Sequence, residues 1–153
     1  MTNIRIDSAR LWMAPRTIAE MEAVRAQEKD PEMFKAYGEM LDLMRAQPGM
    51  EEYTCDWKIC LPDGTAIGGA GFKGVPDKNG DVEIGYGIDE AYRCHGYATE
   101  AVEAMTEWAL MQPGVCRVLA QTGPSNAISQ RVLQKCGFVP CGQGDEGPMF
   151  GRR

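Results

Sequence analysis

Apolar residues recur at three- and four-residue steps in several parts of the chain, which is the spacing of one buried face of an α-helix. The stretch from residue 33 to 44 shows this spacing clearly, and Asp30 can cap the helix that it predicts. In the last such stretch Gly137 suits a left-handed stop, from which Phe138 can fold back on Leu133. The predicted helices are residues 17–27, residues 31–44, residues 98–109 and a segment that begins after Asn126.

Shorter apolar runs between the helices predict strands. Turn signals at Pro62-Asp63-Gly64 and Asn79-Gly80 join three of these runs into an antiparallel meander. The predicted strands are an opening run through Ile4, Ile6 and Leu11, residues 53–61, 66–72, 81–88, 117–122 and 138–141, and a last strand from Met149. This order predicts a single α/β or α+β domain, in which a mixed, mostly antiparallel sheet of about six to seven strands carries helices on both faces.

Composition narrows the class of protein. The chain has 153 residues, enough for one domain with its own core, and 44% of them are apolar and 25% charged, as in globular proteins. Its apolar runs all fall well short of the roughly 20 residues of a membrane span, so we expect no membrane association. The first residues lack the basic start and apolar core of a secretory signal, which favours the cytoplasm.

Net charge and cysteine usage argue against two kinds of partner. A formal charge of −6 disfavours nucleic-acid binding, which needs clustered Lys and Arg, and mildly favours a cationic substrate. The six cysteines include no C-x-x-C pair and the chain has a single histidine, so we expect no metal. In a chain without an export signal the thiols are expected to be free, small buried groups.

The stretch from residue 82 to 98 combines a strand-like run, a short loop and the start of a predicted helix. Such a junction gathers free backbone N–H groups at the positive end of the helix dipole, where an anion can bind. Gly96 and Ala98 leave room for a phosphate to approach the backbone, and Arg93 can add a positive charge. Taken alone, the pattern fits a phosphate cradle and an ordinary glycine-containing loop equally well.

A second glycine-rich segment satisfies the dinucleotide pattern G-x-G-x-x-G, at Gly69-Ala70-Gly71-Phe72-Lys73-Gly74. The residues after it form a turn, whereas the dinucleotide motif needs a helix N-terminus there. These glycines are therefore expected to mark a strand that another backbone or a ligand approaches closely.

The loop at residues 93–98 and its flanks resemble a known family. Arg93-x-x-Gly96-x-Ala98 resembles the R/Q-x-x-G-x-G/A acetyl-CoA signature of the GNAT N-acetyltransferases. Glu83-Ile84-Gly85-Tyr86 precedes it at the spacing seen in the subgroup that acetylates ribosomal-protein N-termini and various small amines. Asn126-x-x-Ser129 and then Arg131-Val132-Leu133-x-Lys135-x-Gly137-Phe138 follow it as in that subgroup. The resemblance covers about residues 66–141, and the first half of the chain matches only in the order of its elements.

The resemblance implies a sheet that splays open at its centre, between the strand ending near Ile88 and the strand 117–122. The pantetheine arm of acetyl-CoA would lie in that gap and pair with the backbone as an added strand. The pyrophosphate would lie on the amides of the loop, and Asn126 would help to hold the cofactor. The implied cofactor-binding residues are Tyr86, Gly87, Ile88, Arg93, Cys94, His95, Gly96, Tyr97, Ala98, Thr99 and Asn126.

Acetyl transfer to an amine needs a base for the amine and a proton for the departing thiolate. Glu83 is our candidate base, acting directly or through a water, because it would face the cofactor gap; its ordinary alternative is an outward strand carboxylate. Ser129 is our candidate on the thiolate side, either as an acid or only as a hydrogen-bond anchor, and Tyr86 is a reserve donor. Many relatives carry a tyrosine where this chain has Leu133, so the usual donor is missing.

Two other features invite a functional interpretation. Cys94 and His95 are adjacent, so their side chains do not face each other as a Cys-His catalytic pair requires, and His95 is expected to face solvent or the phosphates. The methionine-rich helix at residues 33–44 could form an adaptable wall of an acceptor pocket, but core packing is the preferred interpretation.

The sequence thus predicts an acetyl-CoA-dependent N-acetyltransferase that acts by direct attack in a ternary complex. Its acceptor is a protein N-terminus or a small amine. A CoA-binding sensor or interaction module without turnover is the alternative that the missing tyrosine keeps open. Whether two copies of the chain form a homodimer stays open as well.

Overall fold

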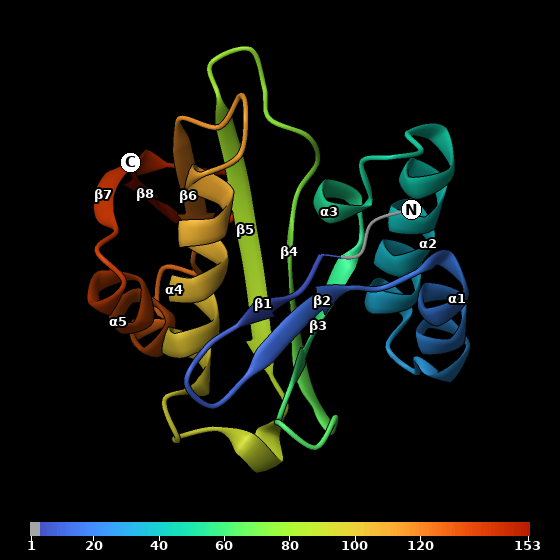
Figure 1. The fold of residues 1–153 in the computed structure, drawn as a ribbon. Helices are drawn as coiled ribbons and strands as arrows, with labels where there is room; N and C mark the ends of the chain where they lie inside the picture. Colours follow the sequence, from blue (N-terminus) through green and yellow to red (C-terminus); the bar gives the residue numbers. More distant parts are fainter. Residues whose placement is uncertain (1–3) are drawn as a thin grey trace.

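The computed structural model describes residues 4–153 and is organised around one eight-stranded sheet with the order β1-β2-β3-β4-β5-β6-β8-β7 (Figure 1). Neighbouring strands pair antiparallel except β5 and β6, which are parallel. This confirms a mixed, mostly antiparallel sheet. The strands are β1 Ile6–Asp7, β2 Trp12–Pro15, β3 Asp56–Cys60, β4 Ala66–Phe72, β5 Asp81–Ile88, β6 Arg117–Gln121, β7 Val139–Gln143 and β8 Pro148–Arg152.

The helices begin and end at the residues that local chemistry favours. Thr17 and Glu20 form a capping box at the first helix, and Asp30 caps the second, which has a proline in its first turn. At the last helix the Phe138 N–H donates to the Leu133 carbonyl at 3.0 Å, the ending predicted from Gly137. The helices are α1 Ile18–Gln27, α2 Pro31–Ala46, α3 Glu51–Thr54, α4 Tyr97–Leu110 and α5 Ala127–Lys135, and a short 3₁₀ turn, η1, spans Glu90–Tyr92.

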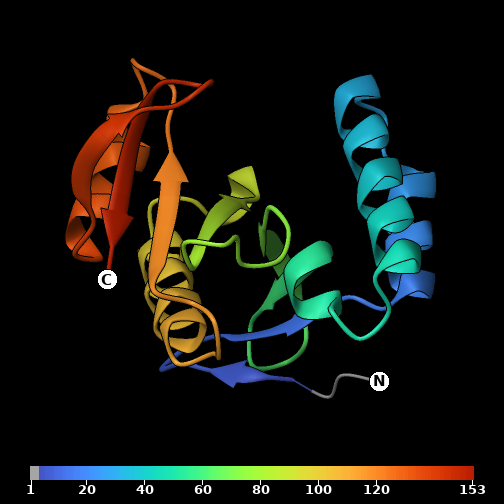
Figure 2. The ribbon, with the colours of Figure 1, turned by 90° about the horizontal axis from the view of Figure 1, so that it is seen from above.

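Alternation along β5 separates the two faces of the sheet. Val82 and Ile84 are buried in the core that α4 covers with Val102 and Met105. The intervening glycines of β5 point to the opposite face, where α2 lies (Figure 2). Helices therefore cover both faces, as predicted.

Two stretches differ from the predicted elements. The opening run forms two strands, β1 and β2, and this raises the number of strands to eight. The strand predicted at residues 53–61 begins only at Asp56, because Tyr53 lies in the single turn α3. From that turn the Tyr53 ring packs against Phe72 and Trp108, so tertiary packing overrides the strand-like pattern.

The glycine-rich segment at residues 69–74 lies in β4 and the turn after it, and the next element is the strand β5 and not a helix, which confirms that it is not a dinucleotide motif. Its glycines do mark close approaches. A side chain at Gly71 would meet the Cys55 carbonyl oxygen at 2.8 Å, and one at Gly69 would meet the Asp56 carboxylate.

The turn between β1 and β2 fastens the start of α4. Glu100, in the first turn of α4, accepts hydrogen bonds from the Ser8 hydroxyl at 2.5 Å and from the Arg10 backbone at 2.8 Å. The Arg10 guanidinium also donates to the His95 carbonyl oxygen at 2.9 Å. The turn between β1 and β2 thereby fixes the position of the loop before α4.

Among the described residues, three cysteines are buried and three are exposed, and all six thiols are free. Within the same part of the chain, none of the helices combines the length and the apolar character that crossing a bilayer would require.

Candidate active site

The parallel pair β5 and β6 separates part-way along its length. In the described chain the two strands pair from Asp81 to Glu83, opposite Arg117 to Leu119. β5 then runs on to Ile88 beside β4, whereas β6 continues beside β8. The backbone of β5 beyond Glu83 is therefore open toward β6, which confirms the predicted opening at the centre of the sheet.

The C-terminal end of β5 leads to a cavity of about 450 Å³ beside the start of α4. Gly96 is the N-cap residue of α4, with φ +79°, and it offers no side chain to cap the first N–H groups of the helix. Those groups and the positive end of the helix dipole are therefore available to an anion. The lining consists of Ile88, Tyr92, Arg93, Cys94, Gly96, Tyr97, Ala98, Thr99, Ile128, Arg131, Val132 and Lys135.

Seven of the eleven predicted cofactor-binding residues line this cavity, and Tyr86 and Gly87 line a different one described below. His95 and Asn126 lie outside both described linings. His95 has its ring 5.7 Å from that of Tyr97, and the Asn126 side chain caps α5 by accepting the Ser129 N–H at 3.0 Å. The Arg93 Nε donates to the Ile88 carbonyl at 2.9 Å, which ties the loop to the end of β5.

Arg131 and Lys135 are cavity residues that stand in the quoted family pattern but received no binding role from the sequence. They stand four positions apart on α5, so both side chains fall on the helix face that meets the loop before α4. Their spacing on a predicted amphipathic helix is a signal that could have identified them. They bring positive charge to the cavity, which suits an anionic ligand.

Glu83 lies at the point where β5 and β6 separate, and its carboxylate is held by two neighbours. Lys73 Nζ is 2.6 Å from Glu83 Oε2, and Gln121 Nε2 donates to both carboxylate oxygens at 3.1 Å. Lys73 also reaches Glu146, at 2.8 Å. Desolvation works against a charge on Lys73, but hydrogen bonds to Glu146 and Glu83 outweigh it and raise the pKa of the ammonium group. The sequence indicated neither Lys73 nor Gln121, because their meeting with Glu83 depends on strand register.

Tyr86 and Ser129 meet across the opening. The Tyr86 hydroxyl lies 2.6 Å from the Ser129 hydroxyl, a contact between β5 and α5. Burial raises the pKa of Tyr86, although the bond to Ser129 acts in the opposite direction. Leu133 is fully buried in the core. The two candidate donors named from the sequence are thus one hydrogen-bonded pair.

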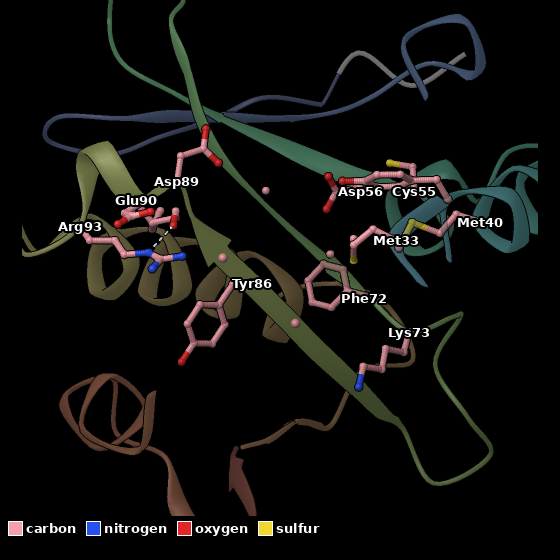
Figure 3. Close-up of a pocket in the computed structure, with 16 residues that line it drawn as sticks. Met33, Met40, Cys55, Asp56, Phe72, Lys73, Tyr86, Asp89, Glu90 and Arg93 are labelled. Carbon is pink, nitrogen blue, oxygen red and sulfur yellow. Dashed lines mark hydrogen bonds between the residues drawn. The ribbon is translucent and has the colours of Figure 1, made fainter. Parts of the chain in front are cut away.

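A second cavity, of about 670 Å³, lies on the other side of β5, between that strand and α2 (Figure 3). Gly85 and Gly87 form part of its floor, since a side chain built on either would meet almost no neighbouring atoms. The remaining lining is Met33, Tyr37, Met40, Cys55, Asp56, Gly69, Gly71, Phe72, Lys73, Tyr86, Ile88, Asp89, Glu90 and Arg93.

The methionine-rich helix α2 has two roles. Leu41 and Met44 are buried, as the core-packing interpretation expected. Met33 and Met40 instead line the cavity, and Met33 is 37% exposed. The expectation that these methionines serve core packing is therefore wrong for Met33, because one turn of the helix extends beyond the edge of the core.

Asp56 is a largely buried carboxylate at the floor of the same cavity. Burial raises its pKa to about 6, against the opposing effect of its ion pair with Arg16. Asp89 and Glu90 add exposed carboxylates to the lining. The cavity therefore offers apolar methionine walls and acidic groups, a combination suited to a cation with an apolar body.

Comparisons with known proteins identify the family of the chain. A family model described as an acetyltransferase (GNAT) domain matches residues 9–139. YjdG of Bacillus subtilis, described as an uncharacterized N-acetyltransferase, is 40% identical over 84 residues, which are 54% of this chain and 50% of that protein. YjcK of the same organism, a probable N-acetyltransferase, is 40% identical over 55 residues, 36% of this chain and 30% of that protein. The matched segments span about half or less of these relatives.

Solved structures share the fold over nearly the whole chain. A ribosomal-protein-S5-alanine acetyltransferase from Vibrio fischeri has a TM-score of 0.76 at 14% identity, covering 98% of this chain and 96% of its own. RimL, a ribosomal-protein acetyltransferase in complex with coenzyme A, has a TM-score of 0.75 at 17% identity and 97% coverage of both chains. The resemblance drawn from residues 66–141 is confirmed by the family model, and the chain belongs to the GNAT acetyltransferase family.

Proposed function

We propose that this protein is an acetyl-CoA-dependent N-acetyltransferase that transfers the acetyl group to a primary amine by direct attack within a ternary complex. The observation that carries the proposal is the separation of β5 from β6 after Glu83. The backbone edge opened there runs from a carboxylate to the uncapped start of α4. A thioester carrier with an anionic end needs an extended channel that ends in an anion site.

The cavity at the start of α4 fits the phosphates of acetyl-CoA. Its backbone N–H groups lack a side-chain cap, and Arg131 and Lys135 supply positive charge from α5. When bound, acetyl-CoA supplies the activated acetyl group as a thioester. Residues 86–88 of β5 offer their free backbone edge to its extended arm, the mode of binding by strand addition.

The cavity on the α2 side of β5 is proposed as the acceptor site. It meets the cofactor channel at the end of β5, because Ile88 and Arg93 line both cavities. Its acidic groups and methionine walls favour a cationic amine, in line with the negative charge of the chain. The acceptor is therefore a small amine or a protein N-terminus.

Glu83 is the proposed base. An amine of ordinary pKa near 10 is protonated at neutral pH and must lose a proton before it attacks. Glu83 faces the opening and can accept that proton directly or through a water. On the thiolate side, the Tyr86 hydroxyl is the proposed donor, and Ser129 orients it through their 2.6 Å hydrogen bond. A tyrosine is protonated at neutral pH, and burial raises the pKa of Tyr86 further in the same direction.

The proposal is tested by measuring thiol release from acetyl-CoA with a panel of amines. The panel holds short peptides with a free N-terminus and small primary amines. We expect release that depends on the added amine, with one of the two groups preferred. Tight acetyl-CoA binding with no release for any member of a broad panel would favour the alternative, a CoA-binding module without turnover, which the leucine at position 133 motivates.

Glu83→Gln is expected to lower the turnover rate by about 10²- to 10⁴-fold at neutral pH, the usual contribution of a general base. The loss should shrink as the pH rises toward the pKa of the acceptor amine, because less deprotonation is then required. Acetyl-CoA binding should be unchanged. Glu146→Gln is the matched control, since it also removes a carboxylate partner of Lys73 but leaves the proposed base in place. Equal rates for Glu83→Gln and the unmodified protein across this pH range would exclude Glu83 from the mechanism.

Gly96→Glu is expected to abolish acetyl-CoA binding, because it puts bulk and negative charge at the anion site. The readout is thermal shift: a ligand at about a hundredfold excess over Kd stabilises a protein by about 2.7 kcal/mol, and this gain should vanish. Gly114→Glu is the control, since Gly114 has a similar φ of +82° at an open turn after α4. If Gly96→Glu keeps the shift, the cavity at α4 is not the cofactor site.

Tyr86→Phe is expected to lower kcat by about 10²-fold or more, as loss of a general acid does. Ser129→Ala should lower it by only about tenfold, because it removes one hydrogen bond worth about 1.5 kcal/mol. The ratio of the two losses in kcat shows which residue is the proton donor and which one orients it. A larger loss in Ser129→Ala than in Tyr86→Phe would reverse these roles.

A further inference from the structure

The chain itself places a primary amine against the proposed base. Lys73 Nζ lies 2.6 Å from Glu83 Oε2, closer than its 2.8 Å contact with Glu146. The side chain is half exposed, so it is not sealed in the core. An amine nitrogen in hydrogen-bond contact with the base is the arrangement that a bound acceptor would need.

Strand register fixes the position of this lysine. The Lys73 backbone N–H donates to the Glu83 carbonyl at 2.8 Å, so the two residues face each other across β4 and β5. The Lys73 stem then passes over Gly85: a side chain built at Gly85 would have Lys73 Cε as its only neighbour, at 3.9 Å. The ammonium nitrogen lies over β5 in the same cavity as Met33 and Phe72 (Figure 3).

The place where the amine lies is the place where the sheet opens. Glu83 is the last residue of β5 that pairs with β6, and Gly85 belongs to the edge that the opening leaves free. Lys73 therefore projects into the acceptor cavity directly beside the proposed thioester channel. Its flexible four-carbon stem can move the nitrogen by more than an ångström without a change in the backbone.

We propose that Lys73 is an acceptor within the protein's own chain, so that the enzyme acetylates its own Lys73 Nζ with acetyl-CoA. This proposal rests on the proposed function. The Lys73 ammonium gives one proton to Glu83, the amine attacks the thioester carbonyl, and the N–C bond forms as the C–S bond breaks. The departing thiolate takes a proton from the Tyr86 hydroxyl, which regains one from solvent, while Glu83 and the nitrogen each release one proton to solvent, so that one proton is released overall. The products are Nε-acetyl-lysine and free CoA thiol.

The modification would change the site. An acetylated Lys73 has no positive charge, so its ion pairs with Glu83 and Glu146 would be lost. Glu83 would then be released from its lysine partner and keep Gln121. The reaction should be slow compared with turnover of a free amine, because the same two carboxylates stabilise the charged form of Lys73.

The chain offers two lysines as internal comparisons. Lys78 is exposed on the turn between β4 and β5 and reports purely chemical acetylation. Lys58 forms a similar ion pair, at 2.8 Å to Glu20, but on β3 and away from the opening. Neither lysine both forms an ion pair with a carboxylate and lies where β5 and β6 separate.

The test is to incubate the 153-residue protein with isotopically labelled acetyl-CoA and no added amine, and to follow each lysine by peptide mass spectrometry. We expect label on Lys73 at least about tenfold faster than on Lys78 or Lys58. Glu83→Gln, which keeps the lysine, should slow Lys73 labelling by about 10²-fold or more. Gly96→Glu should remove the site preference, and Lys73→Arg should carry no label there while keeping the cofactor-induced thermal shift.

Two results would overturn the inference. One is equal labelling of Lys73 and Lys78, and the other is Lys73 labelling that Gly96→Glu leaves unchanged. Measuring the amine panel on the same preparation distinguishes failure of self-acetylation from failure of the proposed function. Turnover of added amines with an unlabelled Lys73 removes self-acetylation alone, whereas no acetyl-CoA binding and no thiol release remove both.

Discussion

The separation of β5 from β6 is the feature on which the rest of the site depends. Parallel strands normally satisfy each other's backbone groups along their whole length, and this pair stops doing so after Glu83. The freed edge of β5 needs another partner, and an extended ligand can supply one. Because β5 leads straight into the loop before α4, the same opening links Glu83, the proposed base, to the proposed anion site.

The two faces of β5 carry different side chains and meet different neighbours. Even-numbered residues such as Val82 and Ile84 bury one face of the strand against α4. Tyr86 continues that parity but extends to Ser129 on α5, so the strand carries its candidate donor on this side. The opposite face bears glycines and a cavity toward α2. The end of β5 therefore lies between two cavities, one at the start of α4 and one beside α2.

Charge is distributed in keeping with this division. The cavity at α4 collects N–H groups, Arg131 and Lys135, whereas the cavity at α2 collects carboxylates. Arg93 and Lys73 add cations to the acidic side, and Lys73 is paired with Glu83. A half-exposed ion pair of this kind contributes little to folding stability. Its bearing on the site is that a primary amine contacts the proposed base.

The sequence by itself determined the element order, the helix caps, the loop at residues 93–98 and the family, because these rest on local spacing and turn chemistry. It also named Glu83, Tyr86 and Ser129. Tertiary structure decided what these residues touch: Lys73 and Gln121 reach Glu83 only through the register of β4, β5 and β6, and Arg131 meets the loop only because α5 packs beside α4. It also moved Tyr53 into a helical turn and Met33 to a cavity wall. Contacts between segments far apart in the sequence leave no periodic pattern in it, so only the tertiary structure could identify them.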